Sequence, residues 1–137
     1  MKVGFTGTRI GLTDYQHTQV FYTLHRWAQD FRLEEAGTFL HGDCIGADAQ
    51  SAEIARELGY TIEAFPSNQR LYRAFTNADI LHTPVEPLRR NRLIVQQCEV
   101  LIACPSAAAE IVRSGTWMTV RYARNRGRKL IMIPPRV

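Results

Sequence analysis

Short apolar runs alternate with segments of helical periodicity along the chain. The apolar runs at 2–6, 38–41, 61–65, 100–104 and 129–133 have the length and composition of buried strands. Between most of them, apolar side chains recur every three or four residues, the spacing of one helix face. This alternation predicts an α/β fold: a Rossmann-like three-layer sandwich around a parallel sheet of about five strands, with right-handed crossovers.

Local end signals support the predicted helices. Thr13 and Gln16 form a capping-box pattern at the start of a first helix. Pro87 suits the first turn of a helix over 88–97, and a last helix is expected over 115–126. The segment 66–86 is different because it shows no sustained period and is long for a connection, so we expect a lid or binding loop there, with a short helix around 69–75.

Composition limits the class of protein. The 137 residues are expected to form a single nucleotide-binding domain over 1–137, and 45% hydrophobic with 22% charged residues is typical of a globular domain. No apolar run has the roughly 20 residues of a membrane span, and the first residues lack a signal-peptide pattern. We therefore expect a cytoplasmic protein with no membrane partner. Three cysteines without zinc-type spacing predict reduced thiols, no metal and no cofactor.

The basic residues are strongly biased toward arginine. Arginine supplies 15 of the 17 basic side chains, and its planar fork suits phosphate and carboxylate oxygens. GC-rich codon usage is an equally good explanation of this bias. A net charge of +4 permits contact with nucleic acid without requiring it.

Loops that follow the predicted strands carry glycine and polar residues. The loops at 7–11, 42–48, 66–86 and 105–116 all leave the carboxyl ends of strands. In open parallel sheets these ends meet at one edge, where ligands bind near the switch in strand order. We therefore expect the four loops to face one crevice that binds a phosphate or nucleotide.

The start of the last predicted helix is the strongest candidate for a phosphate site. Ser114 is a plausible N-cap, Gly115 lets a ligand approach the backbone closely, and the first turn offers free N–H groups at the positive end of a helix dipole. A nicotinamide-type site is disfavoured because G-x-G-x-x-G is absent, and the Walker A pattern is also missing. The four histidines show no metal spacing and no nucleophile partner.

Other charged residues have alternative interpretations. Arg9 reaches an anion at the strand ends or pairs with Asp14, and Asp43 contacts ligand or caps a helix. Asp48 is the better candidate for contact with a sugar hydroxyl or an amide. The predicted ligand-binding residues are Gly7, Thr8, Arg9, Gly42, Asp43, Gly46, Asp48, Arg89, Asn91, Arg92, Pro105, Arg113, Ser114, Gly115 and Thr116.

On the helix over 88–97, Arg89 and Arg92 share one face and Arg90 points elsewhere, and we expect either Arg89 or Arg90 to reach the site while the other arginines are solvated. Tyr72 and Phe75 either stack on a base or pack the loop against the core.

Taken together, these motifs resemble the SLOG superfamily, which groups DprA/Smf DNA-processing proteins with LOG phosphoribohydrolases. The resemblance runs from Gly7-Thr8-Arg9 through HGDCIGADAQSAEIARELG (41–59) and RRNRLIV (89–95) to RSGTWMTVRYA (113–123), and it looks nearest to the small YspA/YpsA-related members. It implies a Rossmann-like sheet and a nucleotide-related ligand in the crevice. Because related proteins often pair through their helices, it also suggests a homodimer.

The resemblance departs from the enzymatic members at one motif. These carry P-G-G-x-G-T-x-x-E; here Gly115-Thr116 matches the Gly-Thr, whereas Met118 and Thr119 stand where glutamate should follow. A carboxylate would stabilise the oxocarbenium-like state of N-glycosidic cleavage. The catalytic candidates are therefore Asp43, Asp48 or Glu110 as substitutes, with Arg89 as the arginine of the preceding helix.

Three functions follow as hypotheses. The first is a domain that binds a nucleotide or nucleotide-derived ligand as a sensor, carrier or sequestering protein. The second is an enzyme on the same site that hydrolyses a nucleoside monophosphate or an ADP-ribose-like compound. The third is DprA-like binding of single-stranded DNA. The few lysines and the absence of a row of stacking aromatic residues disfavour it, whereas the arginine-rich last helix favours it, with Arg121, Arg124, Arg126 and Arg128.

Overall fold

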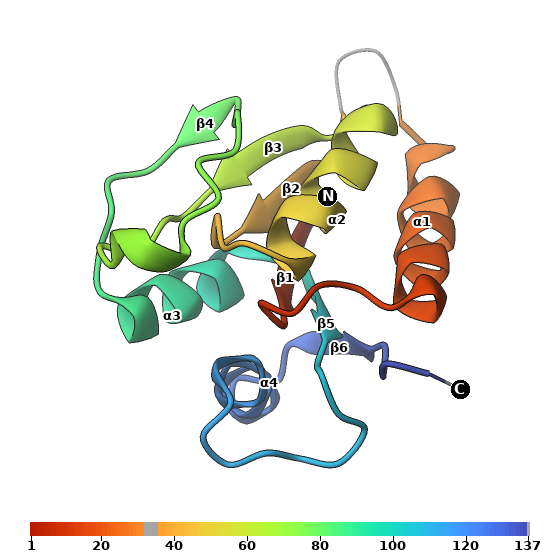
Figure 1. The fold of residues 1–137 in the computed structure, drawn as a ribbon. Coiled ribbons are helices and arrows are strands. Elements are labelled where there is room, and N and C mark those ends of the chain that lie inside the picture. The colour runs from red at the N-terminus through yellow and green to blue at the C-terminus, as the bar shows by residue number, and fades with distance from the viewer. Residues whose placement is uncertain (32–35, 137) are drawn as a thin grey trace.

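A parallel six-stranded sheet lies between two layers of helices in the computed structural model, which describes residues 1–31 and 36–136 (Figure 1). The sheet order is β4-β3-β2-β1-β5-β6. The strands are β1 (Lys2–Gly7), β2 (Thr38–His41), β3 (Thr61–Ala64), β4 (Ile80–Leu81), β5 (Val100–Cys104) and β6 (Lys129–Met132). The helices are α1 (Asp14–Ala28), α2 (Ala47–Glu57), α3 (Pro87–Gln97) and α4 (Gly115–Asn125), with a 3-10 helix, η1 (Arg70–Tyr72).

The predicted fold class is confirmed. Helices α1 and α2 pack together on one face of the sheet, and α3 and α4 pack together on the other. Successive side chains of a strand point to opposite faces of the sheet, so each strand contributes to the hydrophobic cores on both faces. In β2, Phe39 packs in the core on one face and Leu40 in the core on the other. Burying each of these side chains contributes roughly 1.5–3 kcal/mol.

The sixth strand was not predicted. β4 lies inside the segment 66–86 and pairs with β3 over only two residues, too few to show a period. The carboxylate of Asp79 accepts a hydrogen bond from the Ile62 N–H at 2.7 Å, and the Asp79 N–H donates to the Ile62 carbonyl at 2.9 Å. The short helix expected around 69–75 is the single turn η1.

The predicted capping box at the start of α1 is confirmed and does more than begin a helix. Thr13 and Gln16 exchange side-chain to backbone hydrogen bonds of 3.1 Å. The buried Gln16 amide also donates to the carbonyls of Pro105 at 2.9 Å and Ile133 at 3.0 Å. The cap therefore ties α1 to the chain leaving β5 and β6.

Strand β1 marks the switch in strand order. The chain builds outward from β1 through β2, β3 and β4, and then crosses to the other side of β1 to form β5 and β6. The carboxyl ends of β1 and β5 are therefore the expected position of a ligand crevice. No helix of the described residues is long and apolar enough to cross a membrane.

Candidate functional site

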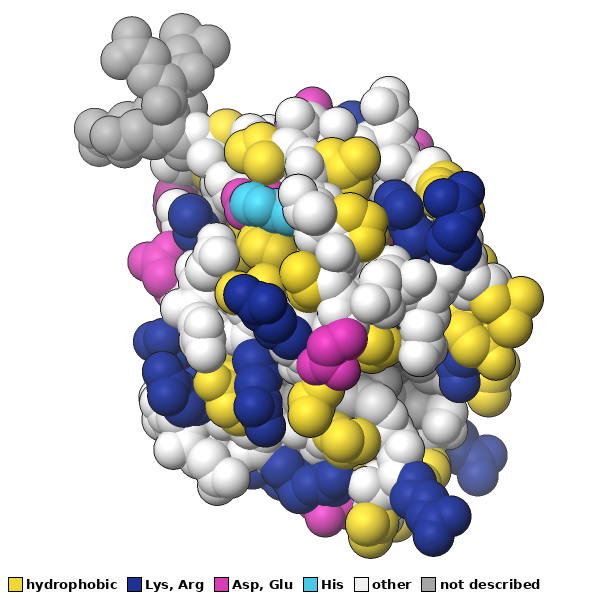
Figure 2. Space-filling model, turned by 90° about the vertical axis from the view of Figure 1, so that its left-hand side faces the viewer, with side chains coloured by type: hydrophobic (Ala, Val, Ile, Leu, Met, Phe, Trp, Pro, Cys, Tyr) yellow, Lys and Arg dark blue, Asp and Glu magenta, His cyan; other side chains and the backbone are white. Residues whose placement is uncertain are grey.

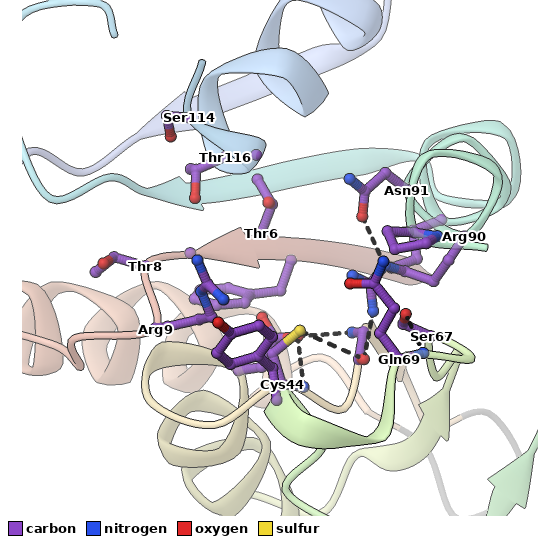
Figure 3. Close-up of a pocket in the computed structure, with 18 of the residues that line it drawn as sticks. Thr6, Thr8, Arg9, Cys44, Ser67, Gln69, Arg90, Asn91, Ser114 and Thr116 are labelled. Atoms are coloured by element: carbon purple, nitrogen blue, oxygen red, sulfur yellow. Dashed lines mark hydrogen bonds between the residues drawn. The ribbon is translucent and has the colours of Figure 1, made fainter. Parts of the chain in front are cut away.

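A cavity of about 330 Å³ lies at the carboxyl ends of the central strands. Figure 3 shows Ser114 and Thr116 on one side of this pocket, Arg9 and Cys44 on the opposite side, and Arg90 with Asn91 at one end. Ten of the fifteen predicted ligand residues line it: Gly7, Thr8, Arg9, Gly42, Asp48, Asn91, Arg113, Ser114, Gly115 and Thr116. The loops after β1, β2, β3 and β5 meet here, as their strand ends predict.

The first turn of α4 presents free backbone donors to the pocket. The Ser114 hydroxyl accepts a hydrogen bond from the Trp117 N–H at 3.3 Å, which makes it the N-cap. The N–H groups of Gly115 and Thr116 have no acceptor among the described residues. A Cβ at Gly115 would meet no protein atom within 4 Å, so the space before this turn is open. Such a turn suits an anion.

The charges that line the pocket are mostly positive. Four arginines and one carboxylate line it: Arg9, Arg73, Arg90, Arg113 and Asp48. The Arg9 guanidinium lines the pocket and stacks over the Tyr72 ring at 3.8 Å, and it does not pair with Asp14. Arg113 is exposed and makes no side-chain hydrogen bond to the described residues.

Arg90 forms the inner end of the pocket. Its side chain is buried, and Nη1 donates to the carbonyls of Gly42 at 2.6 Å and Phe65 at 3.4 Å. Nε donates to the Asn91 Oδ1 at 2.6 Å. A Cβ on Gly42 would lie 2.6 Å from Arg90 Nη1 and 3.0 Å from Asp48 Oδ2, so only glycine fits between them.

Asp48, on the first turn of α2, lies beside this arginine. Its Oδ2 accepts hydrogen bonds from the N–H groups of Gly42 at 2.9 Å and Cys44 at 3.2 Å. Burial raises the pKa of Asp48, while His41, Arg90 and the two N–H groups oppose that shift. Burial, assisted by the Asp48 charge, also raises the pKa of the Cys44 thiol to about 11, so this thiol is protonated at neutral pH.

The structure corrects the expectation that Asp43 faces a ligand. Asp43 has a left-handed backbone (φ 56°) and a buried carboxylate, and it does not line the pocket. That carboxylate accepts hydrogen bonds from the Thr76 N–H at 2.9 Å, from the Thr76 hydroxyl, and from Arg73 Nε at 3.1 Å. Asp43 therefore fastens the segment 66–86 to the loop after β2.

Gly46 and Pro105 are also structural. Gly46 has φ +83°, and a Cβ there would collide with the Arg9 carbonyl, so glycine lets the two loops touch. Pro105 is buried, and its carbonyl accepts the Gln16 amide described above. Neither residue lines the pocket.

Of the two arginines that the helical spacing left open, the structure brings Arg90 to the pocket. Arg89 and Arg92 are exposed and do not line the pocket, whereas Arg90 does. Arg90 lies four residues before the buried Ile94, so the apolar phase of the helix was the signal that placed position 90 on the inner face. Glu110 also lies outside the pocket and pairs with Arg121 at 3.5 Å and with Arg124 at 3.9 Å.

Several lining residues were missed by sequence reasoning. They are Thr6, Cys44, Ser67, Gln69, Arg73, Pro87 and Ser106. Thr6 ends the predicted strand over 2–6 and Cys44 lies in the loop over 42–48, so their position at strand ends was the available signal. Ser67, Gln69 and Arg73 belong to a segment without periodicity, where the sequence carries no such signal.

His41 is a structural residue of the loop after β2. It is buried, its Nδ1 accepts the Asp43 N–H at 3.0 Å, and burial lowers its pKa, against the charges of Asp48 and Asp43. It does not line the pocket. Within residues 1–31 and 36–136, no group of three His, Cys, Asp or Glu side chains is arranged to hold a metal ion.

Comparison with known proteins gives matches to solved structures alone. No family model matches the chain, and no curated protein does. The molybdenum cofactor binding protein of Rippkaea orientalis superposes with a TM-score of 0.71 at 19% identity, over 97% of this chain and 76% of that one. The molybdenum cofactor carrier protein of Chlamydomonas reinhardtii gives 0.67 at 16% identity, over 96% and 75%.

DNA processing protein A (DprA) of Streptococcus pneumoniae is similar over part of its length. It superposes with a TM-score of 0.69 at 21% identity, covering 97% of this chain and 50% of that protein. The chain therefore shares the Rossmann-like fold of the molybdenum cofactor carriers and of half of DprA, the fold that the SLOG resemblance implied.

Proposed function

We propose that the protein binds a nucleotide or nucleotide-derived ligand through a phosphate or similar anion at the start of α4. The observation that carries this proposal is the pocket itself, where two free N–H groups face a cavity lined by four arginines and one carboxylate. Helix N-termini and guanidinium groups both favour phosphate oxygens. The pocket also lies at the switch in strand order, where open parallel sheets bind ligands.

The size of the pocket favours a small ligand. Its volume of about 330 Å³ is at the lower end of the roughly 300–1000 Å³ common for small-molecule sites. A mononucleotide or a compound of similar size suits this volume better than a dinucleotide. Two of the similar structures are named as molybdenum cofactor binding or carrier proteins, which supports a binding role for this fold.

Of the three carboxylates that could replace the missing glutamate, only Asp48 lines the pocket, so binding is favoured over hydrolysis. Asp43 is held by Thr76 and Arg73, and Glu110 lies outside the pocket, so neither can act on a bound ligand. Met118 is apolar, and the Thr119 hydroxyl donates to the Gly115 carbonyl at 3.0 Å. The protein then acts as a sensor, carrier or sequestering protein, and a relationship to the small YspA/YpsA-related members belongs to the same proposal.

A thermal-shift panel at fixed salt tests this function. It compares AMP, GMP, CMP and ADP-ribose with adenosine, NAD, inorganic phosphate and a short single-stranded DNA. A ligand at about 100 times its Kd adds about 2.7 kcal/mol to the free energy of unfolding. At about 2.1 cal/mol/K of unfolding entropy per residue, this raises the midpoint by roughly 9 °C.

We expect a shift with at least one phosphorylated compound and a smaller one with adenosine. Shifts with DNA alone, falling steeply as salt is added, would favour the DprA-like function instead. Figure 2 shows the face of the molecule over β4, η1 and α3. The basic side chains on this face form separate groups among apolar ones rather than a continuous track, which argues against DNA binding there. No shift with any compound contradicts the proposal.

A further inference from the structure

Asp48 places a hydrogen-bond acceptor in an otherwise cationic pocket. Its Oδ2 is occupied by the N–H groups of Gly42 and Cys44, at 2.9 and 3.2 Å. Its Oδ1 makes no hydrogen bond to any described residue. Asp48 lines the pocket, although only 5% of the residue is exposed. One carboxylate oxygen is therefore free to accept from a ligand.

We infer that Asp48 selects ligands that carry a hydrogen-bond donor, foremost the cis-diol of a ribose 5′-phosphate unit, together with the anion. This inference rests on the proposed function, because the anion must bind at α4 for the donor to reach Asp48. The carboxylate repels the phosphate while the α4 turn and Arg113 attract it.

A ribose hydroxyl suits this position for a physical reason. Asp48 lies on the first turn of α2, after the loop that follows β2, and a carboxylate oxygen at this position can accept a hydrogen bond from a ribose hydroxyl. An exocyclic amine of a base offers the same donor chemistry. The pairs AMP with dAMP and GMP with IMP separate these two sources, because each pair differs by one donor group.

The substitution Asp48→Asn reverses the polarity of the free atom without changing its shape. The N–H groups of Gly42 and Cys44 require an oxygen acceptor, so the amide oxygen takes the place of Oδ2 and the NH2 group takes that of Oδ1. The loop keeps both hydrogen bonds, and the pocket gains a donor in place of an acceptor. Loss of the negative charge should also raise the affinity for inorganic phosphate.

The experiment measures Kd by isothermal titration for AMP, dAMP, GMP, IMP and inorganic phosphate with wild type and Asp48→Asn. We expect the wild type to prefer AMP over dAMP, or GMP over IMP, by about 10-fold or more, as for a hydrogen bond to a charged group. Asp48→Asn should reduce that ratio to near one. The wild-type ratios need no variant, so they test the inference even if Asp48→Asn fails to fold.

Equal affinities within both pairs in the wild type overturn the inference, and so does a preference that persists in a folded Asp48→Asn. In either case, binding of AMP or phosphate leaves the proposed function standing. If none of the five probes binds to wild type, the proposed function fails first and takes this inference with it.

Discussion

Arg90 joins three parts of the site with one side chain. Its Nη1 donates to the carbonyls of Gly42 and Phe65, the residues directly after β2 and β3, and its Nε donates to the Oδ1 of the neighbouring Asn91. A buried guanidinium holds such carbonyls more firmly than a neutral donor, because hydrogen bonds to charged groups are stronger. The inner wall of the pocket therefore depends on a residue of α3 rather than on the loops alone.

We expect Arg90→Met to lower the free energy of unfolding by roughly 1.5–3 kcal/mol, because two buried carbonyls lose a charged donor. Urea denaturation measures this change. Arg89→Met is the matched control on the same helix, and since Arg89 is exposed its effect should stay within about 0.5 kcal/mol. Equal losses in the two variants would contradict the role assigned to Arg90.

The sequence predicted the position of a residue where the local backbone determines it, and did not where contacts distant in sequence determine it. Ser114 and Gly115 were found because caps and glycines act locally. The sequence assigned ligand contact to Asp43, but its carboxylate is taken up by Arg73 and Thr76, which lie 30 and 33 residues further on. No local pattern predicts a contact over that distance.

At the scale of elements, α4 presents its first turn to the pocket. The Ser114 cap leaves the N–H groups of Gly115 and Thr116 free, and the exposed Arg113 precedes them. The helix continues through Trp117 and Val120, which are buried against the sheet and hold the turn in place. A rigid helix end of this kind needs no rearrangement to receive an anion.

Gly115→Val should abolish binding of phosphorylated ligands with little effect on folding. The protein has open space at this position, with nothing within 4 Å of an added Cβ, so the side chain obstructs the ligand rather than the fold. Isothermal titration with AMP measures the loss, and the unfolding midpoint reports the fold. Ala108→Val, at an exposed position of the loop between β5 and α4, is the control that should keep wild-type affinity.

If a folded Gly115→Val binds AMP as wild type does, the anion does not bind at α4.

The elements themselves were largely predictable. Strands β1, β2, β3, β5 and β6 follow apolar runs, and the helices α1, α3 and α4 have local start signals at Thr13, Pro87 and Ser114. β4 was missed because two residues show no period. On α3 the helical spacing separated Arg90 from Arg89 and Arg92, and the apolar positions Ile94 and Val95, which are buried against the sheet, show which of these faces turns inward.

For the whole molecule, the buried His41 links stability to pH. Its pKa lies below 6.5 in the folded state, chiefly because of burial, whereas in the unfolded chain it titrates near 6.5. Below that pH the unfolded chain binds a proton that the folded protein resists. This stability is therefore present above about pH 6.5 and is lost as the pH falls toward the folded pKa. Burial raises the pKa of Asp48 above 3.8, so its contribution to stability has the opposite sign. That contribution is full below about pH 3.8 and is lost as the pH rises through the folded-state pKa.

We expect the free energy of unfolding to fall between about pH 7.5 and pH 5.5, and His41→Gln to flatten that dependence, because glutamine can accept the Asp43 N–H without titrating. Urea denaturation at the two pH values gives the slope. His17→Gln, at an exposed position on α1, should keep the wild-type slope. A slope that His41→Gln leaves unchanged would assign the acid sensitivity to another group.

The central claim is that a phosphate-bearing ligand binds at the first turn of α4, inside the pocket between β1 and β5. Amide NMR spectra of the ¹⁵N-labelled protein, titrated with AMP and in parallel with adenosine, test this claim most directly. We expect AMP to produce the largest shifts at the Gly115 and Thr116 amides, with smaller shifts at Gly7 and Gly42, and adenosine to leave the α4 turn unchanged. Saturable AMP shifts confined to residues outside the pocket, or equal α4 shifts with adenosine, would contradict it.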